Sequence, residues 1–378
     1  MSGTTAFIRS TCPSVFFASM PDASSSPSPD ARPSVSERRA EADAFRFDPI
    51  HPNVRFGTAS DRYGGWLGQI YPEDEYAGRI STRKRKLGGR SYEERRVPIE
   101  SVRHYFEHFG VLEIDFTFYR PLREADGDPS SNYHVLSNYA EHAPDDARFL
   151  VKAPQMFFAR SLRRSGEFID NTDFLDRDAY LRTFHEPVQE ILGDRLAGVI
   201  FQQEYQRVSD SPSPEANVEE LDAFFRNLPD DEVQAHIELR SEHLLQPVYF
   251  DWLEERGLGH VFSHWTWLPQ IRDQWRMSGE RLPAANNEVV ARLLTPRNTK
   301  YAEAYDVAHP FDAPVPEITD TQEAQDMVLD TTALTYRAEA ENALLNVVAN
   351  NRAWGNAPDL ARTIAHRILD EEERRGES

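Results

Sequence analysis

The chain has 378 residues, and 39% of them are hydrophobic, which is enough apolar mass for one large core or two smaller ones. Its 42 basic and 63 acidic residues give a formal net charge of −21, which disfavours a general binder of nucleic acid or anionic membranes. The single cysteine, Cys12, excludes an internal disulfide and a cysteine-based metal cluster. No apolar run approaches the roughly 18 residues that span a bilayer, so we expect a soluble, cytoplasmic protein; its oligomeric state stays open.

Residues 1–50 are expected to form a disordered tail. The stretch 20–36 is dense in Ser, Pro, Ala and Asp, a composition that cannot offset the entropy cost of ordering. Arg9 precedes a short apolar run at residues 15–18, but this run is too short and proline-flanked for a signal peptide. Only four of the 42 basic residues are lysines, and with the acidic surplus this suggests a salt-adapted host as a hypothesis.

The first predicted strand covers residues 54–59, and a basic segment over residues 79–96 follows it with eight basic and two acidic residues. We interpret this segment as a solvated insertion loop, with an anion-attracting flap as the alternative. Residues 98–109 are predicted to be helical. His104 and His108 lie one turn apart there, a spacing that can bind metal, although a surface face is the preferred interpretation.

The strand predicted over residues 111–117 is central to the fold because its side chains alternate strictly in polarity. Pro121 cannot donate to a sheet and should lie beyond its end. An amphipathic strand with inward carboxylates suits a barrel with helices outside and chemistry inside. The two faces carry Leu112, Ile114 and Phe116 against Glu113, Asp115 and Thr117.

The rest of the chain alternates between strands and helices. Helices are predicted over residues 173–192, 217–227, 246–256, 320–340 (with Thr319 or Asp320 as cap) and from about 358 into the acidic end, and further strands over 148–153, 196–203, 234–240, 259–263, 289–295 and 343–351. Eight strands joined by helices favour a closed barrel, and the polar rows in several strands argue against an open sheet buried on both faces. The predicted fold is therefore α/β: a single TIM-like (β/α)₈ barrel over residues 51–370, between the N-terminal tail and an acidic end at 371–378.

Active sites of such barrels lie at the C-terminal ends of the strands. Glu113 or Glu238 is expected to be the general base or acid, since a buried carboxylate among cations stays ionised. Lys152 is a third catalytic candidate, because a lysine in a chain so poor in lysine suggests a deprotonatable amine, with Schiff-base chemistry as one use. The predicted substrate-binding residues are Thr117, Tyr119, Gln202, Arg240, Arg292, Asn350 and Asn351.

Two alternatives to a catalytic pocket stay open. Lys152, Arg240 and Arg292 would suit a carboxylate or phosphate group, but they could also pair with the acids as a structural charge network. A metal site remains conceivable from acidic and histidine side chains, yet no tight ligand spacing is present, and we predict neither metal nor cofactor. That conceivable set is Glu113, Asp115, Glu238, His236 and His264.

The segment His264-Trp265-Thr266-Trp267 follows the sixth predicted strand. It could form a stacking wall for a sugar or a base, or an ordinary packed loop. No glycine-rich phosphate loop, nucleophile elbow or Rossmann fingerprint occurs.

The order of several short motifs resembles the YecE-like family of uncharacterised TIM barrels (domain of unknown function 72). The resemblance spans roughly residues 54–366 and implies a TIM-like barrel, with Glu113, Lys152, Glu238, Arg240, Arg292 and Asn350 around its mouth. The family's activity is not established, so the resemblance supports the fold and not a reaction. The motifs are Phe56-Gly57-Thr58, Trp66-Leu67-Gly68, Tyr71-Pro72, Leu112-Glu113-Ile114-Asp115, Thr117-Phe118-Tyr119, Phe149-Leu150-Val151-Lys152-Ala153-Pro154, Phe201-Gln202, Glu238-Leu239-Arg240, Arg292-Leu293, and Asn350-Asn351 with Gly355 and Ala357.

The chain also departs from the family pattern. Ser241 follows Arg240 where the family usually has His, Leu294-Thr295 stands where it favours His-Gly, and the insertion at 79–96 is unusual. These departures bear on whether the substrate is shared.

Together these features predict an enzyme that acts on a small anionic or sugar-like molecule by acid-base, lysine-assisted chemistry at the barrel mouth. The alternatives are a non-catalytic ligand-binding or accessory protein and a metal-dependent nuclease or isomerase. We expect a small-molecule ligand and no membrane partner, and nucleic acid is a disfavoured partner.

Overall fold

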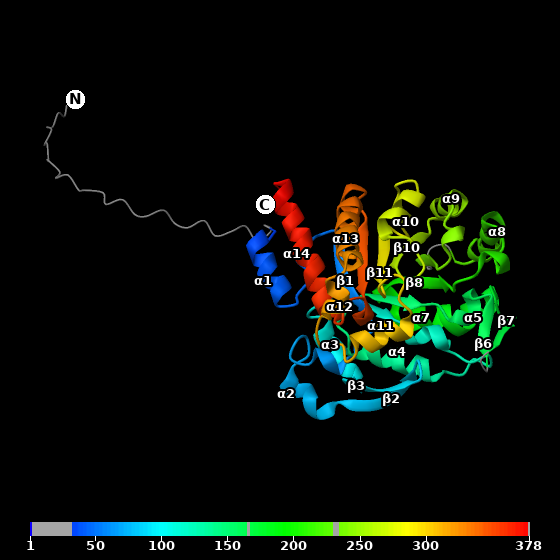
Figure 1. The fold of residues 1–378 in the computed structure, drawn as a ribbon, viewed down its shortest axis with the longest axis horizontal. Coiled ribbons are helices and arrows are strands. Elements are labelled where there is room, and N and C mark those ends of the chain that lie inside the picture. The colour runs from blue at the N-terminus through cyan, green and yellow to red at the C-terminus, as the bar shows by residue number, and fades with distance from the viewer. Residues whose placement is uncertain (2–31, 165–166, 230–233, 377–378) are drawn as a thin grey trace. The chain divides into compact units, whose positions relative to one another are not determined.

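The computed structural model describes residue 1 and residues 32–164, 167–229 and 234–376. The chain divides into two units, Met1–Pro33 and Ser34–Ser378, and the second holds the fold. Eight parallel strands, of which Figure 1 labels β1, β8, β10 and β11, close into a barrel in the order β1, β12, β11, β10, β9, β8, β5 and β4. The strands are β1 Val54–Ala59, β4 Val111–Ile114, β5 Phe149–Lys152, β8 Leu196–Gln203, β9 Ala235–Leu239, β10 Gly259–His264, β11 Glu288–Leu293 and β12 Leu344–Ala349. The predicted TIM-like barrel is confirmed.

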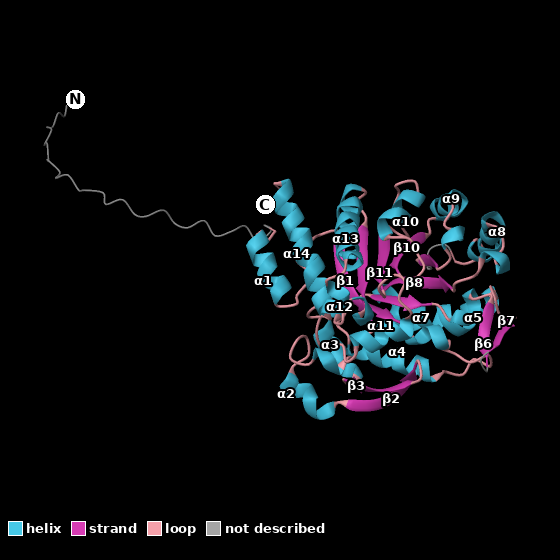
Figure 2. Cartoon of the chain, viewed as in Figure 1, coloured by secondary structure: helices cyan, strands magenta, loops and turns pink. Residues whose placement is uncertain are grey.

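Helices surround the barrel strands, which lie inside them in Figure 2. Among the described residues no helix is both long and apolar enough to cross a membrane. The helices are α1 Val35–Asp43, α2 Glu73–Tyr76, α3 Val102–Tyr105, α4 Ser131–His142, α5 Gln155–Phe158, α6 Arg177–Tyr180, α7 Glu186–Leu192, α8 Pro214–Phe225, α9 Pro247–Arg256, α10 Ile271–Met277, α11 Tyr301–Ala308, α12 Pro316–Thr319, α13 Gln322–Ala340 and α14 Ala357–Arg375.

The barrel strands bury both faces, but with different side chains. Their outward residues join the helices in one large apolar cluster, whereas the inward residues form a separate, smaller cluster of mostly β-branched and small side chains. This inner packing is typical of TIM barrels, whose interior is filled by layers of side chains and is not a pore. The inner cluster consists of Ala59, Val111, Leu150, Ala197, Ile200, Val261, Val290 and Val348.

His236 lies inside the barrel, two residues before Glu238 on β9, and is fully buried. Two glycines make room for its ring: a Cβ atom added to Gly259 would lie 2.3 Å from Nδ1, and one added to Gly198 would lie 2.7 Å from Nε2. Burial lowers the pKa of His236 to about 4, so the ring is neutral at pH 7. Below the mouth, the interior therefore holds a polar but uncharged side chain.

The strand predicted over residues 111–117 is too long. β4 ends at Ile114, Asp115 adopts helical backbone angles, and a 3₁₀ turn, η4 (Phe116–Tyr119), follows. The Thr117 hydroxyl explains the break, because it donates to the carbonyl oxygens of Ile114 at 3.3 Å and Lys152 at 2.7 Å and so closes the turn. Glu113 keeps its inward position, whereas Asp115 and Thr117 do not continue the strand.

The predicted 50-residue tail is also too long, because residues 34–50 belong to the folded unit. Ser34 and Glu37 form a capping box at the start of α1, and Arg38 makes a buried ion pair with Glu372 of α14. Since α14 extends to Arg375, Glu372 belongs to this helix and not to a separate acidic end. The apolar run at residues 15–18 lies outside the described residues.

The basic segment is not a loop. It forms an antiparallel hairpin of β2 (Ser81–Leu87) and β3 (Arg90–Arg96), joined by Gly88-Gly89. Both glycines have positive φ, 56° and 82°, as a two-residue hairpin turn requires. The hairpin packs against α11, where the rings of Tyr92 and Tyr305 lie 4.9 Å apart.

Several helices and strands differ from the prediction. The helix predicted over 98–109 is reduced to a 3₁₀ turn (Ile99–Ser101) and α3, and the cap of α13 is Thr321, one residue beyond the predicted positions. The sequence pattern did not predict α4, α10, α11 or a second hairpin of β6 (Ser161–Arg164) and β7 (Glu167–Asp170).

Candidate functional site

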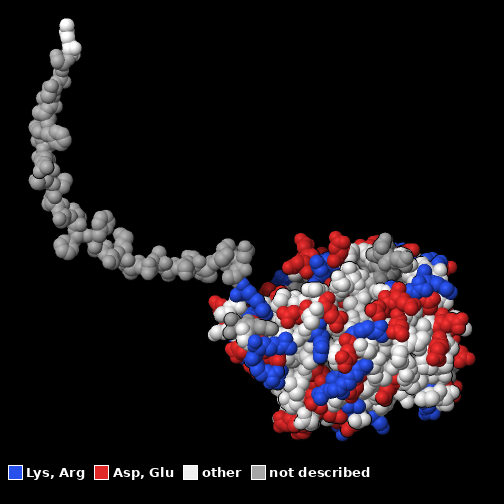
Figure 3. Space-filling model, turned by 90° about the horizontal axis from the view of Figure 1, so that it is seen from above, with Lys and Arg blue, Asp and Glu red and all other residues white. Residues whose placement is uncertain are grey.

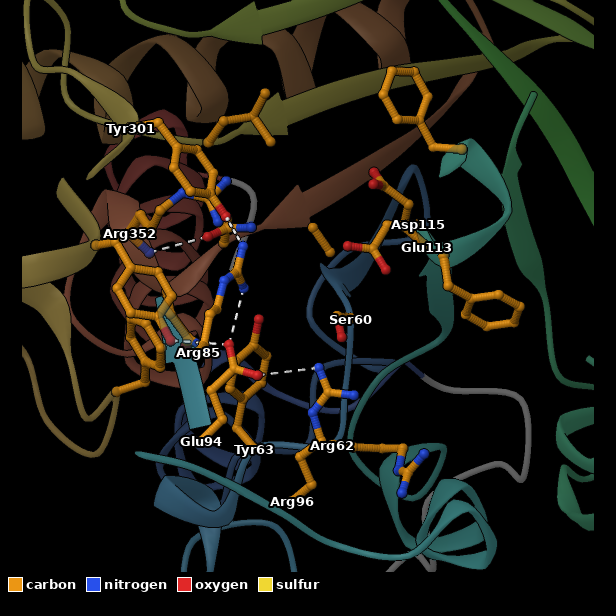
Figure 4. A pocket seen from close by; sticks show the side chains of 18 of the residues that line it. Ser60, Arg62, Tyr63, Arg85, Glu94, Arg96, Glu113, Asp115, Tyr301 and Arg352 are labelled. Carbon is orange, nitrogen blue, oxygen red and sulfur yellow. Dashed lines mark hydrogen bonds and ion pairs between the residues drawn. The ribbon is translucent and has the colours of Figure 1, made fainter. Parts of the chain in front are cut away.

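A cavity of about 810 Å³ lies at the C-terminal ends of the barrel strands, where TIM-barrel enzymes place their chemistry. Nine basic and six acidic side chains line it, which is a local excess of cations in a chain of net charge −21. The outer surface in Figure 3 instead shows both signs interspersed. In Figure 4, Glu113 and Asp115 enter the cavity from one side, and Arg85, Glu94 and Arg96 of the hairpin approach from another.

The deepest part of the cavity is a charge network centred on Arg292 of β11. Its Nε and Nη2 atoms donate to the two carboxylate oxygens of Glu113, at 2.7 and 2.6 Å, and Nη1 donates to Glu238. The Ser263 hydroxyl gives Glu238 a further bond of 2.7 Å. All of these side chains are buried. The register of the strands produces the network, because Ser263 is the β10 partner of Arg292.

The network keeps Glu238 ionised. Burial alone would raise the pKa of this carboxyl, but Arg240, Arg292 and Lys152 outweigh burial and hold the pKa at about 2. The pKa of Arg292 is raised, because the attraction of Glu113 and Glu238 exceeds the opposing effect of burial. Glu238 is therefore ionised at neutral pH, which favours a role as a base or as a fixed negative charge over a role as the general acid.

Lys152 lies at the end of β5 and differs from Arg292 in having no ion pair with any described carboxylate. Its Nζ atom donates to the amide oxygen of Gln202 and lies 3.9 Å from the centre of the Phe118 ring. Burial, and then repulsion by Arg292 and Arg240, lower the pKa of Lys152 to about 7. This amine therefore gives up its proton much more readily than an ordinary lysine does.

Two further arginines, Arg240 and Arg352, line the same cavity as Lys152. Arg240 donates to the Gln202 amide oxygen at 2.8 Å and to Glu238 at 3.3 Å, and its guanidinium carbon lies 4.6 Å from the Trp265 ring centre. Arg352 lies 4.3 Å from the Tyr301 ring centre and pairs with no described carboxylate. Arg62 and Arg95, also in the lining, likewise lack an ion pair within the described chain.

The structure brings most of the predicted site residues to this cavity. Tyr119 is 78% exposed at its rim. Thr117 and Glu238 are the exceptions, because both are fully buried and do not line the cavity. Thr117 uses its hydroxyl to brace the backbone, and Glu238 pairs with Arg240 and Arg292, which do line the cavity. The predicted residues that line the cavity are Glu113, Tyr119, Lys152, Gln202, Arg240, Arg292, Asn350 and Asn351.

The two asparagines have backbone contacts that fix their positions. Asn350 accepts a bond from the Arg352 amide at 3.1 Å, and Asn351 accepts from the Ala357 amide at 2.7 Å and from Trp66 at 3.2 Å. The amide nitrogen of Asn351 is buried without a partner among the described residues.

Asp61 and Arg352 are not among the predicted site residues, although each follows a barrel strand by a few residues. One carboxylate oxygen of Asp61 accepts from the Tyr139 hydroxyl at 2.7 Å, and the other has no partner in the described chain. Burial raises the pKa of Asp61 to about 6. The preceding residue, Ser60, has φ 86° and lines the cavity, so the backbone is strained at this point of the mouth.

The candidate metal ligands do not form a metal-binding group in the described part of the chain. Among the described residues no group of three or more His, Cys, Asp or Glu side chains could hold a metal ion. His264 binds the Thr295 carbonyl oxygen at 2.9 Å, and Arg292 supplies the positive charge between Glu113 and Glu238. His104 pairs with Glu75 at 3.1 Å, while His108 binds the Phe45 carbonyl oxygen at 3.0 Å, so that pair is not a joint site.

Comparison with known proteins bears on the whole barrel. The chain resembles two crystal structures of a DUF72 family protein from Enterococcus faecalis V583, each with 15% identity and a TM-score of 0.50. The match to the first covers 84% of this chain and 95% of that structure's chain. The match to the second covers 85% of this chain and 99% of that structure's chain. A DUF72 family protein from Thermotoga maritima MSB8 has 16% identity and a TM-score of 0.49 over 84% of this chain and 99% of its own. No curated protein matches the chain.

At such identities the structural likeness bears on the fold alone. The family model described as "Protein of unknown function DUF72" matches residues 76–377, most of the chain and nearly the whole barrel. The chain therefore belongs to the DUF72 family.

Proposed function

We propose that this protein is an enzyme that transfers a proton to or from a small anionic molecule bound at the barrel mouth, with Lys152 as the proton-transferring group. The observation that carries the proposal is the setting of Lys152: a buried amine that lines a cavity and has no described carboxylate partner. Burying an amine without a counter-ion is costly, and function is a reason to retain it.

The surroundings of Lys152 suit a general base. Its pKa of about 7 makes the free amine available near neutral pH, which is the range in which a base is both unprotonated and strong enough. The Gln202 amide oxygen fixes the amine, and the Phe118 ring shields one side of it. The same neutral amine could form an imine with a carbonyl substrate.

Two arginines that share the cavity with Lys152 support an anionic substrate. Arg240 and Arg352 lie in the cavity wall, and neither is consumed by a carboxylate in the way that Arg292 is. A bound carboxylate or phosphate would gain charge-assisted bonds from them. Glu113 and Glu238 would act through their fixed negative charge and through Arg292, with Gln202 and Asn350 orienting the substrate.

Hydrogen exchange in D₂O tests the proposal without knowledge of the full reaction. Sugar phosphates, keto acids and other carboxylates with acidic C–H bonds would be incubated with the protein, and deuterium incorporation followed by NMR. We expect incorporation into at least one compound, rising as pH increases through about 7 and at least about 100-fold slower in Lys152→Met, in line with the loss of a general base. Lys300→Met, a change at an exposed lysine outside the cavity lining, should leave the rate unchanged.

The same experiment distinguishes the proposed enzyme from a non-catalytic ligand-binding protein. If a compound binds in the cavity but exchanges no hydrogen and undergoes no turnover at any pH, the protein is a ligand-binding barrel. Equal exchange rates in wild type and Lys152→Met would instead remove Lys152 from the chemistry.

A further inference from the structure

The exposed aromatic side chains of this protein are not scattered. Among the described residues four aromatic side chains are exposed, and all of them line the mouth cavity or a second cavity beside it: Tyr119 (78%), Tyr205 (46%), Trp267 (50%) and Tyr301 (39%). Exposed aromatic rings cost hydration free energy unless something covers them, so their clustering marks a binding surface.

The second cavity has a volume of about 710 Å³ and shares a wall with the first. Phe118, Tyr119, Glu204 and Trp265 line both. The wall formed by β8, β10 and the loops after them carries a set of ring contacts: Tyr205 and Trp267 have centroids 4.9 Å apart, and Trp267 meets Trp265 edge-on at the same distance. The two cavities therefore offer one extended site.

Each side of the shared wall joins a cation to an aromatic ring. Arg240 lies over Trp265, which contacts Trp267, and Lys152 lies over Phe118, which contacts Tyr119 edge-on at 5.4 Å. A ligand that spans the wall would thus place an anionic group near the cations and a flat group among the rings.

The second cavity also contains an unused hydrogen-bonding group. The side-chain amide of Gln206 is closed off from solvent, and both its oxygen and its nitrogen lack a partner within the described chain. The Gln206 backbone is held in place by Ser241, whose hydroxyl accepts from the Gln206 amide nitrogen at 2.8 Å. A carboxamide presents a donor beside an acceptor, the pattern that pairs with the edge of a nucleobase.

We infer that the second cavity is a base-binding subsite and that the extended site takes a nucleotide, with its phosphate beside Arg240 and Lys152 and its base stacked on Tyr205 and Trp267. This inference rests on the proposed function, for which it names the substrate class. Stacking and edge recognition favour a base over a plain sugar. The chain's net charge of −21 favours a mononucleotide over a nucleic-acid strand, whose charge it would repel.

Calorimetric titration tests the subsite with five probes: the common nucleoside monophosphates, ribose 5-phosphate, nucleosides, inorganic phosphate and a short single-stranded oligonucleotide. At least one monophosphate should bind about 5- to 100-fold more tightly than ribose 5-phosphate, the gain expected from stacking one base. Trp267→Ala and, independently, Tyr205→Ala should each remove most of that gain and leave ribose 5-phosphate affinity within about twofold. Gln206→Leu should weaken one base more than the others, and Leu329→Ala, an exposed change outside both cavities, should alter nothing.

The opposite results would overturn the inference. The first is equal affinity for ribose 5-phosphate and every monophosphate. The second is an equal loss of affinity for the monophosphate and for ribose 5-phosphate in Trp267→Ala and Tyr205→Ala. The third is a single-stranded oligonucleotide that binds more tightly than any mononucleotide. Lys152→Met distinguishes the two proposals. Hydrogen exchange into a non-nucleotide anion with no monophosphate bound would overturn the subsite alone. A monophosphate that binds more tightly than ribose 5-phosphate in both wild type and Lys152→Met, without exchange in either, would overturn the proposed function alone.

Discussion

Two groups of cations share the barrel mouth, and they differ in what satisfies them. Arg292 donates two hydrogen bonds to Glu113 and one to Glu238, so each of its three side-chain nitrogen atoms is bound to a carboxylate. Lys152 and Arg352, in the same cavity, have aromatic or amide neighbours and no described carboxylate partner. The comparison indicates that the paired group, represented by Arg292, sets the geometry of the mouth. The unpaired group, Lys152 and Arg352, is available to a ligand.

The difference also has an energetic side. A buried ion pair with good geometry roughly repays the cost of removing its charges from water, whereas a buried amine without a counter-ion does not. Removing a member of the first group should therefore destabilise the fold, and removing Lys152 should stabilise it.

The largest expected effect is that of Arg292→Met. The substitution would leave the carboxylates of Glu113 and Glu238 buried without their shared cation, at a cost of about 3–5 kcal/mol in the free energy of unfolding. Urea denaturation at pH 7 measures this loss. Because the fold itself should weaken, a missing ligand response in this variant would not by itself identify Arg292 as a substrate contact.

A surface arginine supplies the control. Arg276 pairs with Asp273 at 2.7 Å, but its side chain is 63% exposed, so Arg276→Met should change the free energy of unfolding by no more than about 0.5 kcal/mol. Similar losses in the two variants would contradict the distinction between buried and surface charge at this mouth.

Lys152→Met should instead raise the free energy of unfolding. The folded-state pKa of Lys152 is about 7, below the unfolded value near 10.5, so between these values the unfolded chain binds more protons and the stability of the wild type rises with pH. The variant should therefore exceed the wild type by about 2–5 kcal/mol at pH 6–7, and the difference should shrink as pH rises toward 10.5. Urea denaturation at pH 6, 8 and 9.5 measures it; a variant less stable than the wild type at pH 6 would show that Lys152 is a stabilising residue.

Much of this arrangement could be predicted from the sequence, because strand periodicity and strand-end position are local signals. β1 and β8 begin and end at the predicted residues, and the end-of-strand rule brought Glu113, Lys152, Glu238 and Arg292 together. Asp61 and Arg352 lie two and three residues beyond the ends of β1 and β12, and the predicted site residues stop short of them, at Asn351 in the case of β12.

Other features depend on contacts that a linear pattern does not contain. Thr117 alternates correctly with Glu113, yet its bond to the Lys152 carbonyl oxygen on the next strand ends β4 and keeps it out of the cavity. The division of the cations between Arg292 and Lys152 follows from strand register and side-chain reach, which spacing cannot give. The hairpin at 79–96 shows the opposite case, since Gly88-Gly89 between two charged runs was a local turn signal that the charge count obscured.

A smaller effect on stability is expected when the hairpin arginines lose the carboxylate that they bind. Glu94 of the hairpin accepts bonds from Arg85 at 2.9 Å, Arg83 at 3.1 Å and the Tyr305 hydroxyl at 3.0 Å. Glu94→Gln should cost about 1–2 kcal/mol of stability through weaker charge-assisted bonds. It should also raise the affinity for an anionic ligand a few-fold, because the hairpin arginines lose their negative neighbour. Urea denaturation and calorimetric titration measure the two effects, and reduced anion affinity would show that the hairpin cations do not act on the ligand.

The smallest effect on stability is expected for Arg352→Ala, which removes a cation from the available group. The substitution loses the stacking of the guanidinium on Tyr301, worth about 0.5–1 kcal/mol, and leaves no described carboxylate unpaired. Anion affinity should nevertheless fall about tenfold, as expected for one charge-assisted contact. Arg226→Ala, at an exposed arginine outside the cavity, should change neither quantity beyond the surface range of about 0.5 kcal/mol. A large loss of stability in Arg352→Ala with unchanged anion affinity would place Arg352 beside Arg292 in the structural group, and the two-group division of the mouth would then be wrong.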